Sequence, residues 1–395
     1  MQKIKTISLL SMGSALEFYD FTIYGLFSAF MENSFFPKSS NGSLHGFIGI
    51  LLIFGVGYIA RPIGGMIFGS LGDKYGRKYS FRISLIIMAL STMSIALIPS
   101  YMQIGIYAPI LLLLLRIAQG ISIGAELPIS CVFVFEHLSM GKNIFYGATL
   151  FGLSNIGLLL GNIINFILTR NLSYTQTHSF GWRIPFVLGG ILCVLAFYLR
   201  KHLNETNVFT SMQPLRTPLK YLIKNYKLKF MAATFLALAY GICINFGFVL
   251  LFTILEHLYN TPEKVLSELT LLSTLVFCCL DSLIGMLADK FKIKLFTLLT
   301  MGFVQFSLAF YCVLYSYAHG NFVYGLGAML WLTFAASCFD SAIPNILPRI
   351  FEDNIRSSGV ATSYSLGLAL SGVVSVIVST ITVRSNQPLW LIPLI

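Results

Sequence analysis

The chain has 395 residues, of which 56% are hydrophobic and 10% charged, and its formal net charge at pH 7 is +11. A soluble protein of this composition would lack the polar side chains needed to cover its surface, so lipid must surround most of the chain. The positive charge alone would also fit a nucleic-acid-binding protein, and the positions of the basic residues decide between these two classes.

Apolar segments long enough to cross a bilayer, about 20 residues each, recur along the chain. The sequence predicts eleven spanning helices, over residues 7–31, 44–68, 79–99, 107–136, 145–169, 182–200, 230–256, 266–288, 295–317, 322–347 and 358–382. The first segment follows Lys3 and Lys5 as a signal peptide would. It is too long for one and carries Glu17 and Asp20, so we interpret it as the first span.

Residues 387–395 resemble the opening of a twelfth span. As a helix they would reach only about 14 Å, which is too short to cross a bilayer. Either the chain is truncated within helix twelve, or its last turn lies in the membrane interface. We favour truncation, because two six-helix halves require twelve helices.

One short cassette occurs twice, 216 positions apart. Residues 69–78 read Gly-Ser-Leu-Gly-Asp-Lys-Tyr-Gly-Arg-Lys, and residues 285–294 read Gly-Met-Leu-Ala-Asp-Lys-Phe-Lys-Ile-Lys. Each cassette joins two long apolar segments, a repetition that indicates a duplicated membrane bundle of the kind that secondary transporters use. We expect an N-terminal bundle over residues 1–200, a basic linker over 201–229 and a C-terminal bundle over 230–395.

The basic residues are distributed as in a protein that is oriented in a membrane. With the N-terminus in the cytoplasm, 19 of the 26 Lys and Arg residues fall on the inner side and five on the outer side, while Arg61 and Arg116 lie within spans. This is the positive-inside bias. The charge therefore orients a multi-pass protein of the cell inner membrane and contacts anionic lipid, and it does not indicate nucleic acid.

The sequence gives no sign of an enzyme. The seven cysteines fall in apolar segments without metal-ligand spacing, the six histidines are scattered, and no phosphate-binding loop occurs. We therefore expect no catalytic residue, no metal and no cofactor. The expected partners are a small-molecule substrate, protons and the lipid bilayer, with the protein acting as a monomer.

Several motifs resemble those of one transporter family. The cassette at 69–78 resembles the loop signature of the major facilitator superfamily, and the run from Arg116 to Gly120 resembles its fourth-helix motif. Three further runs, at 15–21, 60–65 and 181–186, resemble the metabolite:H⁺ symporter family, which includes permeases for α-ketoglutarate, citrate, shikimate and proline or betaine. The resemblance implies two pseudo-symmetric six-helix bundles that move a carboxylate or zwitterionic metabolite with protons by alternating access.

The second half departs from the family pattern in two places. The second cassette ends in Lys292-Ile-Lys294 where the family has Gly-Arg-Arg, so the turn glycine is lost. Near the eleventh span, Arg349 stands where the family has an acidic residue, and the proline that follows in the family is absent. These changes predict a C-terminal gate that differs from the family's.

The expected mechanism depends on charged residues at mid-membrane depth, because a charge buried there costs considerable free energy and is usually kept for a function. Glu17, Asp20 and Arg116 are all near mid-depth, and the two carboxylates are three residues apart on one helix. Their repulsion would keep one of them protonated. We predict that this cluster, with Gln119 and Tyr24, forms the proton-coupling and substrate site. A permanently paired structural cluster is the alternative.

A second set of residues is expected to form an inner gate. Arg61 and Glu126 lie nearer the cytoplasmic ends of their spans, where they can pair as a gate or simply fix packing. The resemblance implies that Asp73, with Arg77 and Glu136, contacts the N-terminus of helix eleven and closes the inner side. It gives Asp289 the same role in the other half, and the gate includes Arg356.

Three glycines in the fifth span, Gly152, Gly157 and Gly161, leave a smooth helix face for close packing, with a hinge as the alternative. Two acidic residues in the second half, Asp281 and Asp340, match no family motif. Each is either a second protonation site or a residue at a water-exposed helix end.

Three other functions are weighed against proton-coupled uptake. An exporter of a metabolite, siderophore or drug would share the fold, and a truncated carrier that no longer transports, or a sensor, would share the motifs. A channel would not require the paired cassettes or the charged residues at mid-depth.

Overall fold

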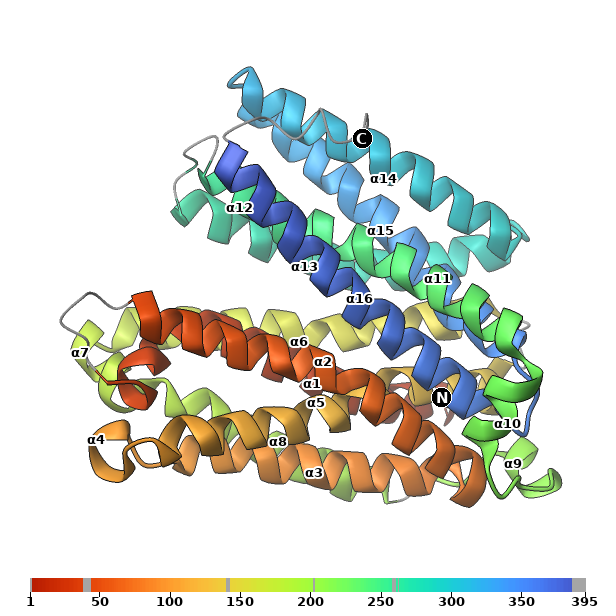
Figure 1. Cartoon of the computed structure of the whole chain (residues 1–395). Helices are drawn as coiled ribbons and strands as arrows, with labels where there is room; N and C mark the ends of the chain where they lie inside the picture. The colour runs from red at the N-terminus through yellow and green to blue at the C-terminus, as the bar shows by residue number, and fades with distance from the viewer. Residues whose placement is uncertain are drawn as a thin grey trace.

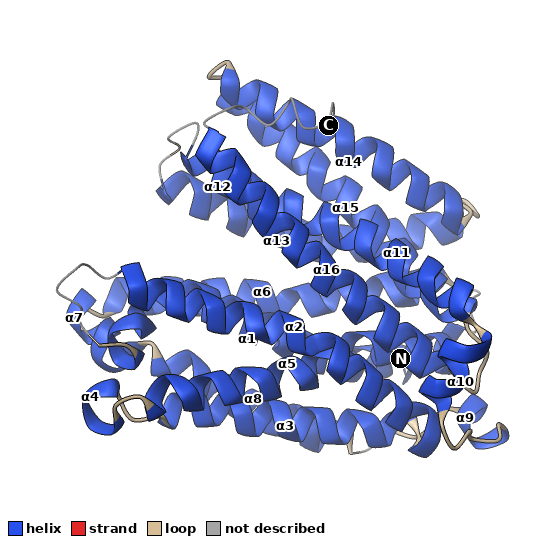
Figure 2. Cartoon of the chain, viewed as in Figure 1, coloured by secondary structure: helices blue, strands red, loops and turns tan. Residues whose placement is uncertain are grey.

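The computed structural model describes residues 2–37, 44–139, 143–201, 203–257, 261 and 263–385, and within these ranges every regular element is a helix (Figure 2). In chain order the elements are α1 (Gln2–Phe35), α2 (Leu44–Tyr75), α3 (Arg77–Leu97), α4 (Tyr101–Ile104), α5 (Tyr107–Val134), η1 (Phe135–Ser139), α6 (Ile144–Asn171), α7 (Tyr174–Gln176), η2 (Thr177–Gly181), α8 (Arg183–Arg200), α9 (Asn207–Ser211), α10 (Pro218–Asn225), α11 (Lys227–Asn245), η3 (Phe246–Leu250), α12 (Leu251–His257), α13 (Glu263–Lys290), α14 (Leu295–Ala318), α15 (Phe322–Ile350) and α16 (Arg356–Ser385).

All eleven predicted spans are helical. Ten of them correspond to one long helix each, and the seventh is built from α11, the π-helical turn η3 and α12. Within the described residues, eight helical stretches are long and apolar enough to cross a membrane, and the long helices α1, α2 and α16 run beside them (Figure 1). The predicted start of a twelfth span, residues 387–395, lies outside the described residues.

The long helices form two groups. The first group is α1, α2, α3, α5, α6 and α8, and the second is α11, α13, α14, α15 and α16 (Figure 1). The groups lie close together at the end that carries α9 and α10, here called the linker end, and diverge toward the opposite end, where α7 and α12 lie. Contacts of α2 with α16 and of α6 with α13 join the two groups.

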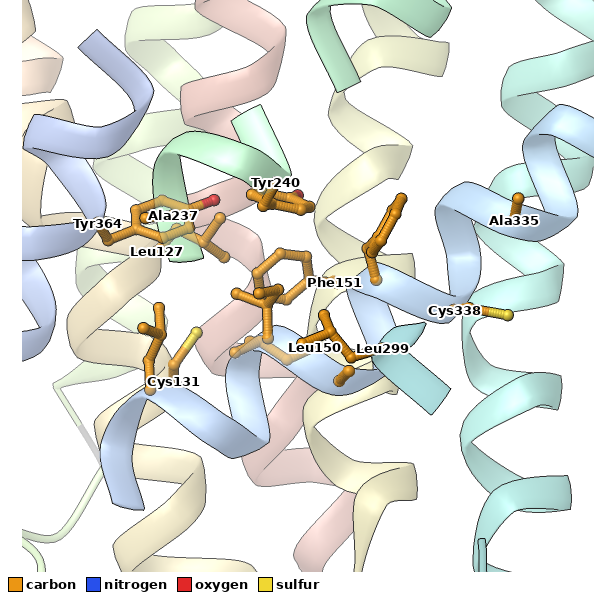
Figure 3. Packing of buried hydrophobic residues seen from close by; sticks show 14 of the residues in the cluster. Leu127, Cys131, Leu150, Phe151, Ala237, Tyr240, Leu299, Ala335, Cys338 and Tyr364 are labelled. Carbon is orange, nitrogen blue, oxygen red and sulfur yellow. The ribbon is translucent and has the colours of Figure 1, made fainter. Parts of the chain in front are cut away.

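Buried apolar side chains from both groups fill the contact between them. Leu127 of α5 and Phe151 of α6 belong to the same buried cluster as Tyr240 of α11, Cys338 of α15 and Tyr364 of α16 (Figure 3). Since one continuous cluster packs helices of both groups, the two groups are held together in this conformation by apolar contact as well as by polar contacts.

Glycines let α2 and α5 approach closely, which places two arginines on facing helices. A Cβ atom added at Gly64 would lie 1.9 Å from the carbonyl oxygen of Ile121, and one added at Gly124 would lie 2.0 Å from that of Arg61. No side chain fits at these distances, so the backbones themselves are in contact. This contact fixes the spacing between Arg61 on α2 and Arg116 on α5.

The three glycines of α6 face two different neighbours. A Cβ at Gly157 would lie 1.8 Å from the Ala15 carbonyl oxygen of α1, and one at Gly161 would lie 2.8 Å from the Thr22 methyl group. Gly152 instead faces α13 of the second group, where its Cβ would lie 2.8 Å from the carbonyl oxygen of Cys278. Helix α6 therefore packs within its own group and across the contact between groups.

We predict that Gly157→Ala destabilises the protein whereas Gly55→Ala does not. The added methyl at Gly157 collides with backbone, which costs on the order of 1–3 kcal/mol, while nothing lies within 4 Å of a Cβ at Gly55. Alanine at Gly55 should even gain up to about 1 kcal/mol of helix propensity. Thermal unfolding of the two purified variants in detergent measures the difference. Equal unfolding midpoints would contradict the close contact between α6 and α1.

Candidate functional site

Asp20 of α1 and Arg116 of α5 form a buried ion pair in which both carboxylate oxygens accept hydrogen bonds. Arg116 Nη1 donates to Asp20 Oδ2 at 3.0 Å and to Gln119 Oε1 at 2.7 Å. The other carboxylate oxygen, Asp20 Oδ1, accepts from Gln119 Nε2 at 2.8 Å and from Thr92 Oγ1 at 3.0 Å. A charged pair buried this deeply is stable only with such partners, so these hydrogen bonds stabilise the Asp20–Arg116 pair.

Tyr24 completes this cluster from the same helix as Asp20. The guanidinium carbon of Arg116 lies 4.0 Å from the centre of the Tyr24 ring, which is a cation–π distance. The structure thus brings together Asp20, Arg116, Gln119 and Tyr24, as predicted, and adds Thr92 of α3. Nothing in the sequence distinguished Thr92 from the other hydroxyl residues of the spans.

Glu17 does not join this cluster, which corrects the expected three-residue site. Its Oε1 lies 3.9 Å from Nη1 of Arg61, and its Oε2 has no hydrogen-bond partner among the described residues. Residues three apart on a helix point in directions about 60° apart and one turn apart in height, so Glu17 faces α2 while Asp20 faces α5. Each carboxylate has its own arginine, and the expected repulsion between them does not dominate.

The expected pair of Arg61 with Glu126 is also wrong. Glu126 instead forms an ion pair with Nη1 of Arg200 and accepts a hydrogen bond of 3.0 Å from the Ser84 hydroxyl. Arg200 ends α8 and reaches the backbone of α1, where its Nε donates to the Leu9 carbonyl oxygen at 2.8 Å. Arg200 was not among the residues singled out from the sequence, although its position as the last residue of the apolar segment 182–200 was a signal that it could be buried.

Arg61 and Arg116 face the same small recess between α1, α2 and α5. Its other lining residues are Phe21, Gly57, Tyr58, Gly120 and Ile123. The Arg61 guanidinium lies 4.4 Å from the Tyr58 ring centre. Two guanidinium groups on one recess, each held by a separate carboxylate and an aromatic ring, are suited to bind a carboxylate group once a carboxylate of the protein releases one of them.

At the linker end, Asp73 caps the N-terminus of α16. Its Oδ1 and Oδ2 accept backbone hydrogen bonds from Ser357 at 3.0 Å and from Ser358 at 2.7 Å. A carboxylate at a helix N-terminus satisfies free N–H groups and interacts favourably with the helix dipole. Because Asp73 lies in the last turn of α2, in the first group, this cap ties the two groups together.

Two arginines and Glu136 extend this contact. Glu136 Oε1 lies 2.9 Å from Arg77 Nη2 and 2.9 Å from Arg356 Nη1, and Arg77 also lies 3.4 Å from Asp73. The Thr206 hydroxyl donates to Glu136 Oε2 at 2.8 Å. One buried network therefore joins the ends of α2, α5 and α16.

Asp289, in α13 of the second group, caps a helix of the first group, as Asp73 of the first group caps a helix of the second. Its two oxygens accept from the backbone N–H groups of Ile144 at 2.8 Å and of Phe145 at 2.9 Å, at the N-terminus of α6. At the position of the lost turn glycine, Lys292 adopts a positive φ of 54°, where the first cassette has Gly76 at φ 106°. A left-handed conformation is strained for lysine, so the second turn keeps a positive φ at a cost.

Asp281 and Asp340 lie apart from both clusters, side by side on α13 and α15. Both are fully buried. Neither is therefore at a water-exposed helix end, which removes one of the two interpretations of these residues.

Comparison with known proteins agrees with this architecture. Residues 10–383 match the Major Facilitator Superfamily. The chain is 32% identical over 398 aligned positions to a putative proline/betaine transporter of Staphylococcus aureus strain COL, covering 98% of the chain and 83% of that relative. It is 30% identical to the proline/betaine transporter of Escherichia coli K12, covering 98% of the chain and 79% of the relative.

Solved structures share the fold at low identity. The proton:xylose symporter XylE bound to 6-bromo-6-deoxy-D-glucose superposes with a TM-score of 0.80 at 16% identity, over 99% of this chain and 90% of XylE. The human organic anion transporter MFSD10 superposes with a TM-score of 0.67 at 15% identity, over 98% and 96%. With an all-helical fold, and a family match that spans nearly all of it, the chain is a multi-pass membrane protein and belongs to the Major Facilitator Superfamily, whose members are transporters and not enzymes.

Proposed function

We propose that this protein is a secondary active transporter that moves a small metabolite, carrying a carboxylate or zwitterionic group, together with protons. The observation that carries the proposal is the pair of arginines, Arg61 and Arg116, that face one recess while each is neutralised by an intramembrane carboxylate. The moving bodies are residues 1–200 and 230–395, connected by the linker 201–229, and the protein works as a monomer with its N-terminus in the cytoplasm.

Proton coupling follows from exchange of partners at Arg116. A proton that binds Asp20 removes the negative charge that holds the guanidinium, and a substrate carboxylate then takes the place of Asp20. The net charge of the cluster is the same before and after, since one proton and one anion enter together. Because the charges balance, the exchange leaves no additional unpaired charge in the membrane interior, where such a charge is unfavourable in free energy.

Arg61 offers the second half of the recess. Its contact with Glu17, at 3.9 Å, is longer than the 3.0 Å contact of Arg116 with Asp20, so Glu17 holds its arginine less tightly. The Phe21 and Tyr58 rings meet edge to face at 5.2 Å between centres beside Arg61. Aromatic faces of this kind also suit the cationic part of a zwitterion, which makes proline and betaine, the compounds named for the relatives, the first candidates.

The inner gate in this proposal is the pair of carboxylate caps at the linker end. Asp73 caps α16 and Asp289 caps α6, each across the contact between groups. Opening this end requires both caps to break, and water replaces the lost hydrogen bonds when it enters. We assign the linker end to the cytoplasm because the linker is basic.

Uptake into proteoliposomes tests the function. Labelled proline and glycine betaine are offered under an imposed inward proton gradient, with α-ketoglutarate, citrate and shikimate as comparison compounds. Gradient-stimulated accumulation of one compound supports proton-coupled uptake. Accumulation that rises when the gradient collapses would support an exporter instead, and no movement of any compound by folded protein would contradict transport of this class.

We predict that Asp20→Asn abolishes uptake driven by the proton gradient but keeps most of the exchange of labelled for unlabelled substrate. The amide resembles the protonated acid and no longer holds Arg116, so substrate still binds but no proton accompanies it. Counterflow and gradient-driven uptake are measured on the same liposomes. The control is Glu268→Gln, which removes an exposed carboxylate. Equal loss of both activities would contradict a coupling role for Asp20.

Arg116→Lys is expected to weaken substrate binding without removing the positive charge. Lysine cannot form the forked contact with a carboxylate, and losing one charge-assisted hydrogen bond of about 1.5–3 kcal/mol raises KM roughly 10–100-fold. Initial uptake rates over a range of substrate concentrations measure KM. Arg170→Lys, at the exposed end of α6, is the matched control and should leave KM unchanged.

Asp73→Asn should lower the stability of the closed linker end. The change removes the negative charge that caps α16 and faces Arg77, at a cost of about 1–3 kcal/mol. Asp353→Asn serves as the control, because the Asp353 side chain is 57% exposed in its contact with Arg356 and such pairs contribute about 0–1 kcal/mol. Thermal unfolding midpoints in detergent are compared, and a larger loss in the control would count against the cap.

A further inference from the structure

Two carboxyl groups in the second half of the chain have no counter-charge. Asp281 on α13 and Asp340 on α15 have exposed fractions of 0% and 1%. Among the described residues, neither forms an ion pair with a lysine, arginine or histidine. Every other buried carboxylate discussed above is held by an arginine or by the N-terminus of a helix, so this pair is an exception that needs a physical explanation.

The partners of the pair are all neutral donors. Asn155 Nδ2 donates to Asp281 Oδ2 at 2.9 Å and lies 3.4 Å from Asp340 Oδ2, and the Tyr240 hydroxyl donates to Asp340 Oδ1 at 2.9 Å. Because one amide nitrogen contacts both carboxyl groups, the two Oδ2 atoms are close neighbours. Two adjacent carboxylates in a buried site cannot both remain ionised, and neutral donors do not cancel their charge.

Within the part of the chain that the structure describes, the elements around the pair supply no cation either. The titratable groups that face it are Tyr240 of α11, Tyr364 of α16, Cys131 of α5, Cys278 of α13 and Cys338 of α15. Figure 3 shows Tyr240, Tyr364, Cys131 and Cys338 within the buried cluster that packs helices of both groups. All of these side chains are neutral when protonated, so the positive charge that the pair requires must come from a bound ligand.

Two further atoms indicate where that ligand binds. Asp281 Oδ1 and the Ser337 hydroxyl oxygen are both buried and have no hydrogen-bond partner among the described residues, although Ser337 lies beside the Asp281 carboxyl group. A proton on Asp281 Oδ1 turns that oxygen into a donor toward Ser337. One proton therefore leaves a single negative charge in the site, and the Ser337 hydroxyl oxygen beside Asp281 can accept the hydrogen bond from the acid.

We propose that Asp281 and Asp340 form a second proton-binding site, separate from Asp20–Arg116 and Glu17–Arg61, that holds one proton in the conformation described here. The proton comes from water and returns to water, and no bond other than O–H forms or breaks. The site does not depend on the proposed substrate, since nothing in the argument involves the recess at Arg61 and Arg116.

The position of Asn155 links this proton to the contact between the two helix groups. Asn155 lies on α6 of the first group, and Gly152, one turn earlier, packs against the Cys278 backbone of α13. Without the proton, two negative charges would be buried in the contact, and separation of α6 from α13 and α15 would let water reach them. Binding of the proton therefore stabilises the contact, and its loss favours opening.

Infrared difference spectroscopy of the full chain in lipid, titrated with protons alone, tests the proposal without any substrate. The expected result is a carbonyl stretch of a buried protonated carboxylic acid at neutral pH. This band should be lost in Asp281→Asn and in Asp340→Asn and should survive in Glu17→Gln and Asp20→Asn. In Ser337→Ala it should persist at a shifted frequency, because the acid loses its acceptor. The amide variants imitate the neutral acid and should fold, which size-exclusion chromatography checks.

Stability gives an independent readout. Thermal unfolding midpoints of the wild-type chain should fall as pH rises through the titration of the pair, and the fall should be smaller in Asp340→Asn, which keeps a neutral side chain at every pH. Absence of the band in the wild type at neutral pH, or a band that persists in both amide variants, would overturn the proposal. So would displacement of the band by sodium at constant pH, which would identify an alkali-cation site instead.

Discussion

The cost of an unpaired charge in a lipid-surrounded interior is the constraint on which this structure depends. Three buried carboxylates in the first helix group meet it with an arginine: Asp20 with Arg116, Glu17 with Arg61 and Glu126 with Arg200. The two members of each pair lie on different helices, so the charges select which helices face one another. The same constraint makes each pair a switch, because any proton or anion that neutralises one member releases the other.

At the contact between the helix groups, carboxylates are stabilised by helix N-termini and not only by arginine side chains. Asp73 and Asp289 bind backbone N–H groups at the first turn of α16 and of α6. A carboxylate at a helix end near water loses little when the helix moves away, because water replaces the N–H donors. Reversible closure is therefore suited to the helix ends, whereas the pairs at mid-depth can exchange partners only for another charge.

Much of the fold could be predicted from the sequence, because span length, charge bias and the repeated cassette are local features of the chain. All eleven predicted helices are present. The sequence could not show which charged or polar side chains contact one another. Which carboxylate faces Arg61 depends on the rotation of α1 and α2 about their axes, which is set by backbone contacts such as Gly64 against Ile121 and leaves no periodic signal. Arg200 and Asn155 were missed as partners for the same reason: their roles exist only after packing.

Buried carboxyl groups lie in both halves of the chain: Asp20 is paired with Arg116 in the first half, and Asp281 and Asp340 share only neutral donors in the second. In the proposed mechanism, a proton on Asp20 releases Arg116, and this couples the proton to an anion in the first half. The Asp281–Asp340 pair has no arginine to release, so in our proposal a proton there admits no anion and acts on the contact between the halves instead. One proposed site thus couples the proton to substrate and the other couples it to conformation, and alternating access needs both couplings.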